Sequence, residues 1–192
     1  MADPDDKALV AAAAGGDSDA FAALYRRHRD RVFRVAAGIM CDREAALDVT
    51  QDVFCKLVGV LGRYDGRAAF TTWLHRVTVN ACYDVLRRRT AIATADPHLA
   101  SGRPESTPEA DTAAAVDVRT ALALLPLDQR SVVVLVDMVG FTYADVADAL
   151  GVAVGTVKSR LARGRLRLAE LLDPGNTGSA SHRRSSGGPG LG

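Results

Sequence analysis

A basic stretch without a single acid lies between residues 154 and 168. It contains Lys158, Arg160, Arg163, Arg165 and Arg167. If the stretch is a helix, a step of about 100° per residue gathers Val157, Leu161, Gly164 and Leu168 on one apolar face. Small and hydrogen-bonding residues then lie roughly opposite, namely Gly155, Ser159, Ala162 and Arg163.

This pattern suits the binding of duplex DNA. Cations on both flanks of the helix can neutralise phosphates on the two walls of the major groove, while the outward face meets base edges. We therefore predict base contacts from Ser159 and Arg163, and phosphate contacts from Lys158 and Arg160. The alternative is a solvated amphipathic helix with an excess of arginine, since basic surface helices are common.

The residues before this stretch favour the DNA-binding interpretation. Residues 141–150 have the pattern of a short helix, in which Thr142 is the N-cap and Asp145, three residues later, completes a capping box. Gly151 supplies the residue that a tight turn requires. A short helix, a glycine turn and a second helix with a basic outward face form a helix-turn-helix motif.

A compact acidic patch is predicted on the helix Arg43–Val60, where Asp48, Gln51 and Asp52 fall on one side. Paired carboxylates can act as a general acid and a general base. This pair lies on a surface helix without a nearby histidine or nucleophile, so a catalytic role is disfavoured. A solvated face and a docking surface both remain open.

A third group combines aromatic, amide and guanidinium side chains. On a helix over Thr71–Arg89, one stripe contains Trp73, Arg76, Asn80, Tyr83, Asp84 and Arg87. Such groups suit unstacked bases, which need a plane to stack on, edges to bond and positive charge for the backbone. The alternative is that Trp73 belongs to the core.

The elements that must position these groups are all expected to be helices. Apolar residues recur at helical spacing, and Asp17 or Ser18, Asp42 and Thr142 stand where helices need N-caps. The predicted fold class is therefore all-α. The expected helices are Asp6–Ala14, residues 18–40, Arg43–Val60, Thr71–Arg89, Ala113–Leu125, Leu127–Val139, residues 141–150 and residues 154–172.

Two small helical domains are predicted, joined by a flexible acidic linker, with the helix-turn-helix in the second. The first domain covers residues 1–90 and the second covers residues 113–173. Residues 91–112 contain three prolines and four acids but one arginine, a composition typical of an extended linker. Residues 174–192 are rich in serine, glycine and proline and are expected to form a disordered tail.

Composition bounds the classes of function. The 192 residues carry a net charge of +1 and are 48% hydrophobic, which allows an ordinary core. Cys41, Cys55 and Cys82 lack metal-ligand spacing, so no zinc site and no other cofactor is expected. No apolar run reaches membrane-spanning length and the acidic start is no secretory signal, so we expect a cytoplasmic protein without membrane insertion.

Several blocks in a fixed order resemble RNA polymerase sigma factors of the extracytoplasmic-function (ECF) subfamily, in the two-domain form and closest to the SigM-like subgroup. Residues 19–28 (DAFAALYRRH), 45–54 (AALDVTQDVF) and 70–89 resemble the second region of the family. Residues 125–130 (LPLDQR) and 155–161 (GTVKSRL) resemble its fourth region. Several blocks in the order typical of the family identify it more specifically than a single helix-turn-helix motif does.

This resemblance implies a protein that binds core RNA polymerase, brings it to particular promoters and helps to open them. Asp48, Gln51 and Asp52 match the positions that dock on the clamp of the largest subunit. The positions that match minus-ten contacts are Asp65, Gly66, Phe70, Trp73, Arg76, Asn80 and Arg87. The positions that match minus-thirty-five contacts are Thr156, Lys158, Ser159, Arg160, Ala162 and Arg163.

The resemblance also implies control by an anti-sigma factor, and no small-molecule substrate. Two features depart from the family pattern: Ala162 stands where relatives carry a larger side chain, and the tail after Pro174 has no counterpart. Leu166 also points outward on the helical wheel without explanation. The main alternative is a stand-alone helix-turn-helix regulator, but residues 1–90 offer no evident sensing or dimerising domain. An enzyme is disfavoured because no catalytic triad, metal-ligand cluster or phosphate loop is present in the sequence.

Overall fold

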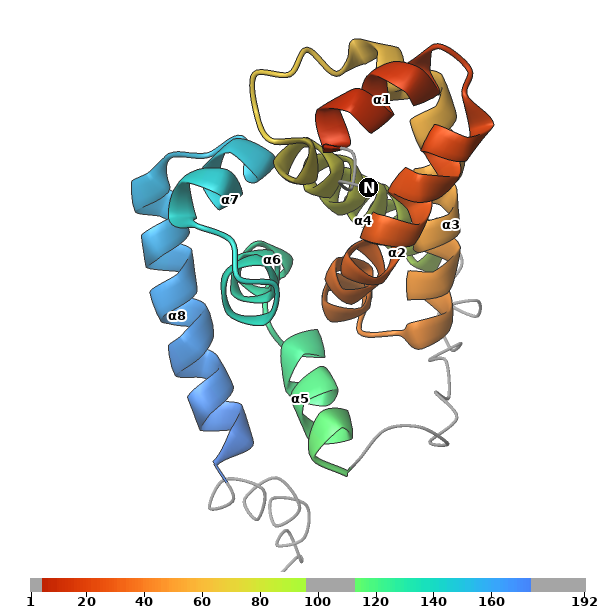
Figure 1. The fold of residues 1–192 in the computed structure, drawn as a ribbon. Helices are drawn as coiled ribbons and strands as arrows, with labels where there is room; N and C mark the ends of the chain where they lie inside the picture. Colours follow the sequence, from red (N-terminus) through yellow and green to blue (C-terminus); the bar gives the residue numbers. More distant parts are fainter. Residues whose placement is uncertain (1–4, 96–112, 174–192) are drawn as a thin grey trace, which may run out of the picture.

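The computed structural model describes residues 5–95 and 113–173, and every regular element in these two stretches is helical. The first stretch contains α1 (Asp6–Ala14), α2 (Ser18–Met40), α3 (Arg43–Val60), the 3-10 turn η1 (Leu61–Arg63) and α4 (Phe70–Ala95). The second contains α5 (Ala113–Ala123), α6 (Leu127–Val133), the π-helical turn η3 (Val134–Met138), α7 (Tyr143–Leu150) and α8 (Val154–Leu172). The predicted all-α fold class is confirmed (Figure 1).

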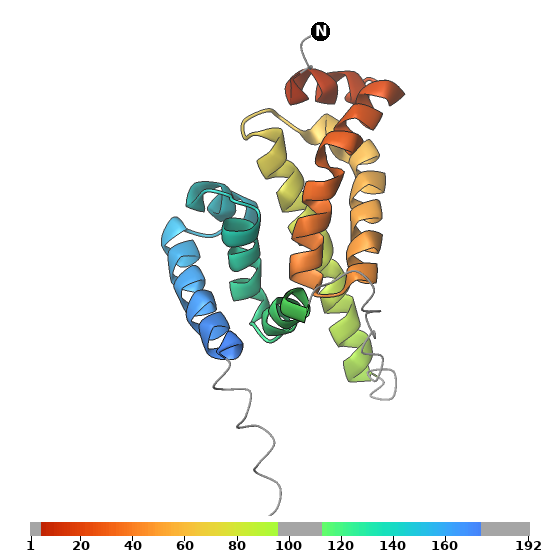
Figure 2. The same ribbon diagram turned by 60° about the horizontal axis from the view of Figure 1, so that its bottom comes forward.

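The first helical unit is a bundle of α2, α3 and α4, with α1 packed across one end (Figure 2). Its helices begin where the sequence provides caps. The Asp17 carboxylate accepts two backbone N–H groups of the first turn of α2, and the Asp42 carboxylate accepts one from the first turn of α3. Cys41 adopts a left-handed conformation with a φ of 54°, which ends α2 and turns the chain into α3.

The core of this bundle is aliphatic. Leu24, Val32, Val53, Leu57 and Leu74 have no exposed surface. Full burial of one such side chain is worth roughly 1.5–3 kcal/mol, so packing between helices, rather than helix propensity, holds the bundle together.

The second helical unit packs α8 against α6 and α7 and contains the helix-turn-helix. The Thr142 hydroxyl accepts the backbone N–H of Asp145 at 3.2 Å, and the Asp145 carboxylate accepts that of Thr142 at 3.3 Å. The predicted capping box is therefore confirmed, and Gly151 ends α7 with a φ of 64°. At Gly164, α8 lies so close to α6 that a Cβ atom would stand 2.7 Å from a methyl group of Val133.

Two helix boundaries differ from the prediction. Helix α4 continues to Ala95, so residues 91–95 are helical rather than part of the linker. Alanine is the best helix former and the next proline is Pro97, so nothing stops the helix earlier. The expected helix Leu127–Val139 changes from α to π geometry at Val134. Residues 96–112, most of the predicted linker, and residues 174–192, the predicted tail, lie outside the described residues.

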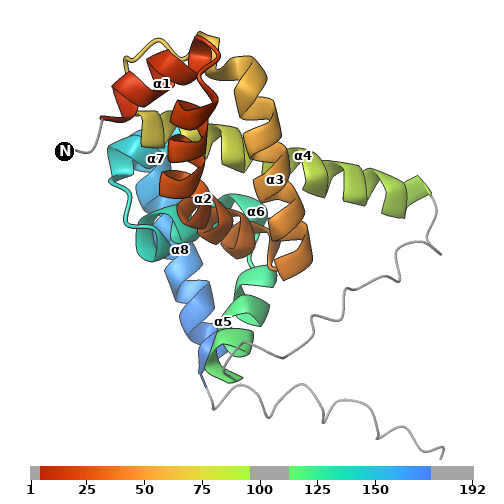
Figure 3. The ribbon, with the colours of Figure 1, turned by 45° about the vertical axis from the view of Figure 1, so that its right-hand side comes forward.

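The two helical units lie against each other. Helices α2 and α4 of the first unit contact α5, α6, η3 and α7 of the second. In Figures 2 and 3 the second unit follows one side of the first along much of its length. The prediction of two domains joined by a linker did not include this packing.

Candidate nucleic-acid interface

The outward face of α8 is the one that the helical wheel predicts. Ser159, Ala162 and Arg163 are exposed, whereas Val157 and Leu161 are buried against the rest of the unit. The Ser159 hydroxyl donates to a backbone carbonyl one turn earlier at 3.0 Å, and Arg163 Nε donates to the Ser159 carbonyl at 3.2 Å. The Arg163 guanidinium therefore lies along the helix and would have to extend to reach a base.

The basic residues of α8 differ in what they contact. The half-buried Arg160 forms an ion pair of 3.0 Å with Asp128 of α6, on the inner side of the unit. Arg165 binds Asp137 of η3 through two hydrogen bonds of 3.0 and 2.6 Å. Lys158 is exposed and has no ion pair with any residue that the structure describes. On each of the two flanks predicted for phosphates, at least one arginine is therefore already paired with an acid of the protein itself.

The acidic patch on α3 is a surface feature. Asp48, Gln51 and Asp52 are all exposed, and within residues 5–95 and 113–173 neither carboxylate has an ion-pair partner. Two unpaired carboxylates one turn apart repel each other weakly and favour a basic partner. The arrangement fits a docking surface better than a catalytic pair, because both carboxylates are exposed to solvent.

A groove of about 660 Å³ extends this patch across α3 onto α2. Apolar, basic and other polar side chains line it together with one acid, namely Tyr25, Arg29, Asp30, Phe33, Arg43, Leu47, Thr50 and Gln51. The guanidinium groups of Arg29 and Arg43 cover the rings of Tyr25 and Phe33, with distances to the ring centroids of 6.0 and 5.5 Å. Sequence analysis missed the α2 side of this surface. The sequence contains no signal for it, since the exposure of Leu47 on α3 is known only from the structure.

The loop before α4 rests on an aromatic cluster. Asp65 and Gly66 are exposed at its tip, where Gly66 has a φ of 72°. Phe70 is buried, with ring centroids 5.6 Å from Tyr64 and 5.9 Å from Trp73. Trp73 is half-buried, so it belongs to the edge of the core while part of its ring still faces outward. The Tyr64 hydroxyl donates to a carbonyl of the loop at 2.7 Å, which ties the loop to the cluster.

A buried histidine lies behind the aromatic cluster. The His28 ring meets Phe70 edge-on at 5.3 Å between centroids, and its Nε2 atom lies 3.0 Å from the Asp6 carboxylate of α1. Arg27 donates to the same carboxylate at 2.7 Å. Burial acts to raise the pKa of Asp6, but the hydrogen bonds of Arg27 and His28 outweigh it, and the pKa is lowered. Helix α1 is thereby fixed against the side of the bundle that carries the loop.

The stripe predicted along α4 is only partly exposed. Arg76 and Asn80 face outward one turn apart. Arg87 is exposed as well and donates to Asp84 at 2.7 Å. Tyr83 instead turns toward the second unit, where its hydroxyl is bonded, and burial raises its pKa. Arg76 and Asn80 are therefore exposed on the same stripe as Trp73, whereas Tyr83 is not part of the predicted nucleic-acid surface.

The three thiols form no disulfide, and Cys55 lies on α3 one turn after Gln51 of the acidic patch. Cys82 is buried, which raises the pKa of its thiol to about 12, and burial also raises the pKa of Cys41. Cys55 is exposed. Among the described residues, no three histidine, cysteine or acidic side chains gather as a metal site would require. None of the described helices is long and apolar enough to cross a membrane.

Comparison with known proteins places these features in a family. Residues 24–92 match the family model for sigma-70 region 2, and residues 115–168 match that for sigma-70, region 4. The chain is 45% identical over 173 residues to the ECF RNA polymerase sigma factor SigM of Mycobacterium tuberculosis, covering 90% of this chain and 87% of that protein. The chain belongs to the ECF sigma factors. The ECF sigma factor SigE of Mycolicibacterium smegmatis is 36% identical over 155 residues, covering 78% of this sigma factor and 60% of SigE.

Two solved structures resemble this sigma factor over both helical units. One is the sigma factor RpoE in complex with the anti-sigma factor NepR from Bartonella quintana, with a TM-score of 0.71, 27% identity, and coverage of 79% of this chain and 96% of that one. The other is CnrH in complex with the cytosolic domain of CnrY, with a TM-score of 0.67, 28% identity, and coverage of 88% and 97%. The resemblance predicted from the sequence is confirmed, and the protein is a transcription initiation factor that works with RNA polymerase and promoter DNA.

Proposed function

We propose that this sigma factor docks on the clamp of core RNA polymerase through Asp48, Gln51 and Asp52, together with the groove beside them. The observation that carries the proposal is the exposed acidic patch on α3, whose carboxylates have no ion-pair partner among the described residues and which continues into a groove lined by both apolar and charged side chains. An interface of this kind combines charge for orientation with apolar contacts for affinity. Residues 5–95 then form the polymerase-binding and minus-ten domain, and residues 113–173 the minus-thirty-five domain.

We assign minus-ten recognition to the loop from Asp65 to Phe70 and to the exposed part of α4. Extruding a base from the duplex costs a few kcal/mol of stacking. The outward part of Trp73, with Arg76 and Asn80 one turn further along, offers a ring, a cation and an amide that can offset this cost. Arg87 lies near the end of the same face and suits a phosphate of the separated strand.

We assign minus-thirty-five recognition to the outward face of α8. Ser159, Ala162 and Arg163 would meet base edges, and Lys158 a phosphate. Thr156 lies in the first turn of the helix, where the positive end of the helix dipole favours a phosphate as well. Arg160 has a different task here: its ion pair with Asp128 holds α8 on α6, so it positions the helix rather than contacting DNA.

RpoE was solved in complex with the anti-sigma factor NepR, and CnrH in complex with the cytosolic domain of CnrY. By similarity, we infer that this sigma factor is held inactive by an anti-sigma factor in the cytoplasm. The bond-forming chemistry of transcription then belongs to the polymerase, and the sigma factor itself turns over no substrate.

The test is run-off transcription with purified core polymerase on a promoter library, with and without this protein. Specific starts that appear only with the protein are expected. Asp52→Arg should abolish binding to the core polymerase without unfolding the protein, because it reverses a charge at the centre of the patch. Asp148→Arg, at an exposed acid of α7, serves as the matched control and should bind normally. Duplex binding without any specific start would instead favour a stand-alone regulator.

A further inference from the structure

Helix α1 lies outside the part of the chain that the family model covers. The match to sigma-70 region 2 begins at residue 24, whereas α1 spans Asp6–Ala14. The helix is nevertheless packed into the first unit, where Leu9 and Val10 are buried. Figures 1 and 3 show α1 beside the chain that leads through η1 into α4, and α1 contacts η1. It therefore lies next to the segment to which minus-ten recognition is assigned.

The polar contacts of α1 with the bundle come from its first residue. The Asp6 carboxylate accepts a hydrogen bond of 2.7 Å from Arg27 and lies 3.0 Å from Nε2 of His28, both on α2. The two contacts use different oxygen atoms, so one carboxylate holds both neighbours at the same time. The side chain of Asp6 keeps 21% of its surface exposed, whereas His28 is buried. Asp6 thus connects a surface helix to a ring in the interior of the bundle.

The His28 ring also contacts the aromatic cluster that supports the minus-ten loop. It meets Phe70 edge-on, with 5.3 Å between ring centroids. The centroid of Phe70 in turn lies 5.6 Å from that of Tyr64 and 5.9 Å from that of Trp73. Edge-to-face contacts depend on the orientation of both rings. Because Asp6 holds one nitrogen of the imidazole, it restricts the rotation of the His28 ring and, through that ring, the position of Phe70.

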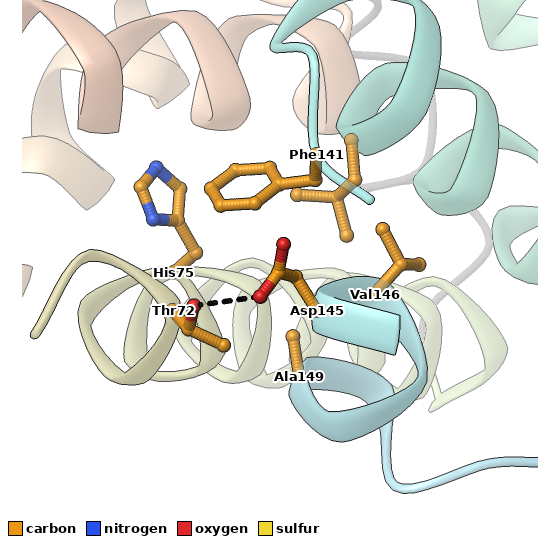
Figure 4. A pocket seen from close by; sticks show the side chains of 7 residues that line it. Thr72, His75, Phe141, Asp145, Val146 and Ala149 are labelled. Carbon is orange, nitrogen blue, oxygen red and sulfur yellow. Dashed lines mark hydrogen bonds between the residues drawn. The ribbon is translucent and has the colours of Figure 1, made fainter. Parts of the chain in front are cut away.

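The opposite face of α4 is held by a different group of residues. At a step of about 100° per residue, Thr72 and His75 lie roughly opposite Phe70 on the helix. Figure 4 shows both side chains facing Phe141 and Asp145 of the second unit. The Thr72 hydroxyl donates to the Asp145 carboxylate at 3.3 Å, and the His75 ring meets Phe141 edge-on at 4.5 Å between centroids. The second unit therefore fixes one face of α4, and the face that carries Phe70 depends on contacts inside the first unit.

We propose that Asp6 is a positioning residue for minus-ten recognition, and that α1 acts on the loop through His28 and Phe70. The proposal rests on the proposed function of the loop from Asp65 to Phe70, which captures an extruded base. A captured base stacks on an aromatic ring, so the ring must stand at a fixed place. Asp6 itself contacts neither DNA nor polymerase. It fixes the place at which the rings of the aromatic cluster meet the base.

Asp6→Ala tests the positioning role. The variant should fold, because Leu9 and Val10 still hold α1 and alanine is the best helix former. The assay is fluorescence anisotropy with assembled holoenzyme and the single strand of a promoter selected by run-off transcription. This strand is compared with copies that carry an abasic site at one minus-ten position at a time. Wild-type holoenzyme should bind the intact strand about 5- to 150-fold more tightly than the copy without the extruded base, as stacking of one base on an aromatic ring provides.

The ratio of these two affinities separates positioning from stability. A variant that is only less stable lowers both affinities by the same factor, because fewer molecules are folded, and the ratio stays constant. Asp6→Ala should lower the ratio at least about threefold, since one hydrogen bond to a charged group is worth a factor of about ten or more. His28→Gln keeps a hydrogen-bonding group but loses the ring, and it should lower the ratio as well. The double variant should fall no further, because the two residues act through one path.

Thr72→Val is the matched control. The substitution removes the hydroxyl that donates to Asp145 but keeps the shape of the side chain, in the same turn of α4 and on the face opposite Phe70. Its ratio should equal that of the wild type.

A wild-type ratio for Asp6→Ala would overturn the positioning role and would leave the assignment of the loop standing. An equal fall for Asp6→Ala and Thr72→Val would also overturn it, since any disturbance of α4 would then have the same effect. If wild-type holoenzyme binds every abasic copy as tightly as the intact strand, the proposed function of the loop fails and the role of Asp6 fails with it.

Discussion

Lys158→Ala should reduce the salt dependence of minus-thirty-five binding, whereas Arg160→Ala should leave it unchanged. The two residues are neighbours on α8 and both are cations, so sequence alone gives them the same role. In the structure Lys158 is exposed without an ion pair to any described residue, whereas Arg160 is half-buried against Asp128 at 3.0 Å. Only the first is therefore available to a phosphate.

The magnitude follows from counterion release. Each phosphate contact contributes about −0.9 to the slope of the logarithm of the binding constant against the logarithm of salt concentration. A fourfold rise in salt, from about 50 to about 200 mM, therefore costs about 3.5-fold in affinity for each contact. Lys158→Ala should bind more weakly at low salt and should lose about 3.5-fold less than the wild type over this range.

Arg160→Ala has a different expected effect. Removing a partly exposed ion pair costs roughly 0.2–1 kcal/mol, which should lower the thermal stability of the second unit slightly. Affinity for DNA then falls equally at every salt concentration, because fewer molecules hold α8 in place.

The assay is fluorescence anisotropy with assembled holoenzyme and a duplex that carries the minus-thirty-five element, in a salt series. The slopes of the wild type and both variants are compared, since absolute affinities also depend on folding. A slope reduced equally by both substitutions would show that Arg160 leaves Asp128 and reaches DNA. A normal slope for Lys158→Ala would refute its assignment to a phosphate.

Two other expectations concern stability. In thermal unfolding, Gly164→Ala should destabilise the second unit by roughly 1–3 kcal/mol, because its Cβ would overlap the buried Val133 of α6 at 2.7 Å. The control is Gly155→Ala, which should not destabilise the unit because a Cβ there would meet nothing within 4 Å. Burial lowers the pKa of His75 from 6.5 to about 4, so the unfolded chain binds the extra proton between these values. The free energy of unfolding should therefore be highest above pH 6.5 and should fall by about 3 kcal/mol as the pH is lowered to about 4. Urea unfolding should show a shallower pH dependence for His75→Gln, and identical slopes would contradict the assignment.

Local signals made most of the helical structure predictable. Asp17, Asp42 and Thr142 cap their helices through side chains that reach only two or three residues along the chain, so the sequence window contains the whole interaction. The buried face of α8 is local in the same sense, because its 3.6-residue period decides which side can face the core. The residues exposed on the opposite face of α8 could therefore be predicted from the same period.

Contacts between distant residues were not predictable in this way. The partner of Arg160 is Asp128, on another helix, and no spacing rule connects them. Gly38 has the sequence context of an ordinary helix position, and only its distance to Val134 shows why it carries no side chain. Tyr83 belongs to the predicted stripe by periodicity, but its hydroxyl is bonded to Ser131 of the other unit. In each case the contact joins residues that are far apart in the sequence, and a local pattern contains no information on such a pair.

The π-helical turn η3 carries a consequence for insertions and deletions in this gene. The backbone N–H of Val139 bonds to the carbonyl of Val134, five residues back, so this turn holds one residue more than an α-helix would. Deleting one residue here would convert the wide turn into a regular α-helical turn, and the residues after it would keep nearly their present direction relative to α6. The deletion would hardly change composition or hydrophobic content. The loss of one residue in η3 should therefore displace α7 and α8 less than the loss of one residue inside α6, where the helix holds no extra residue.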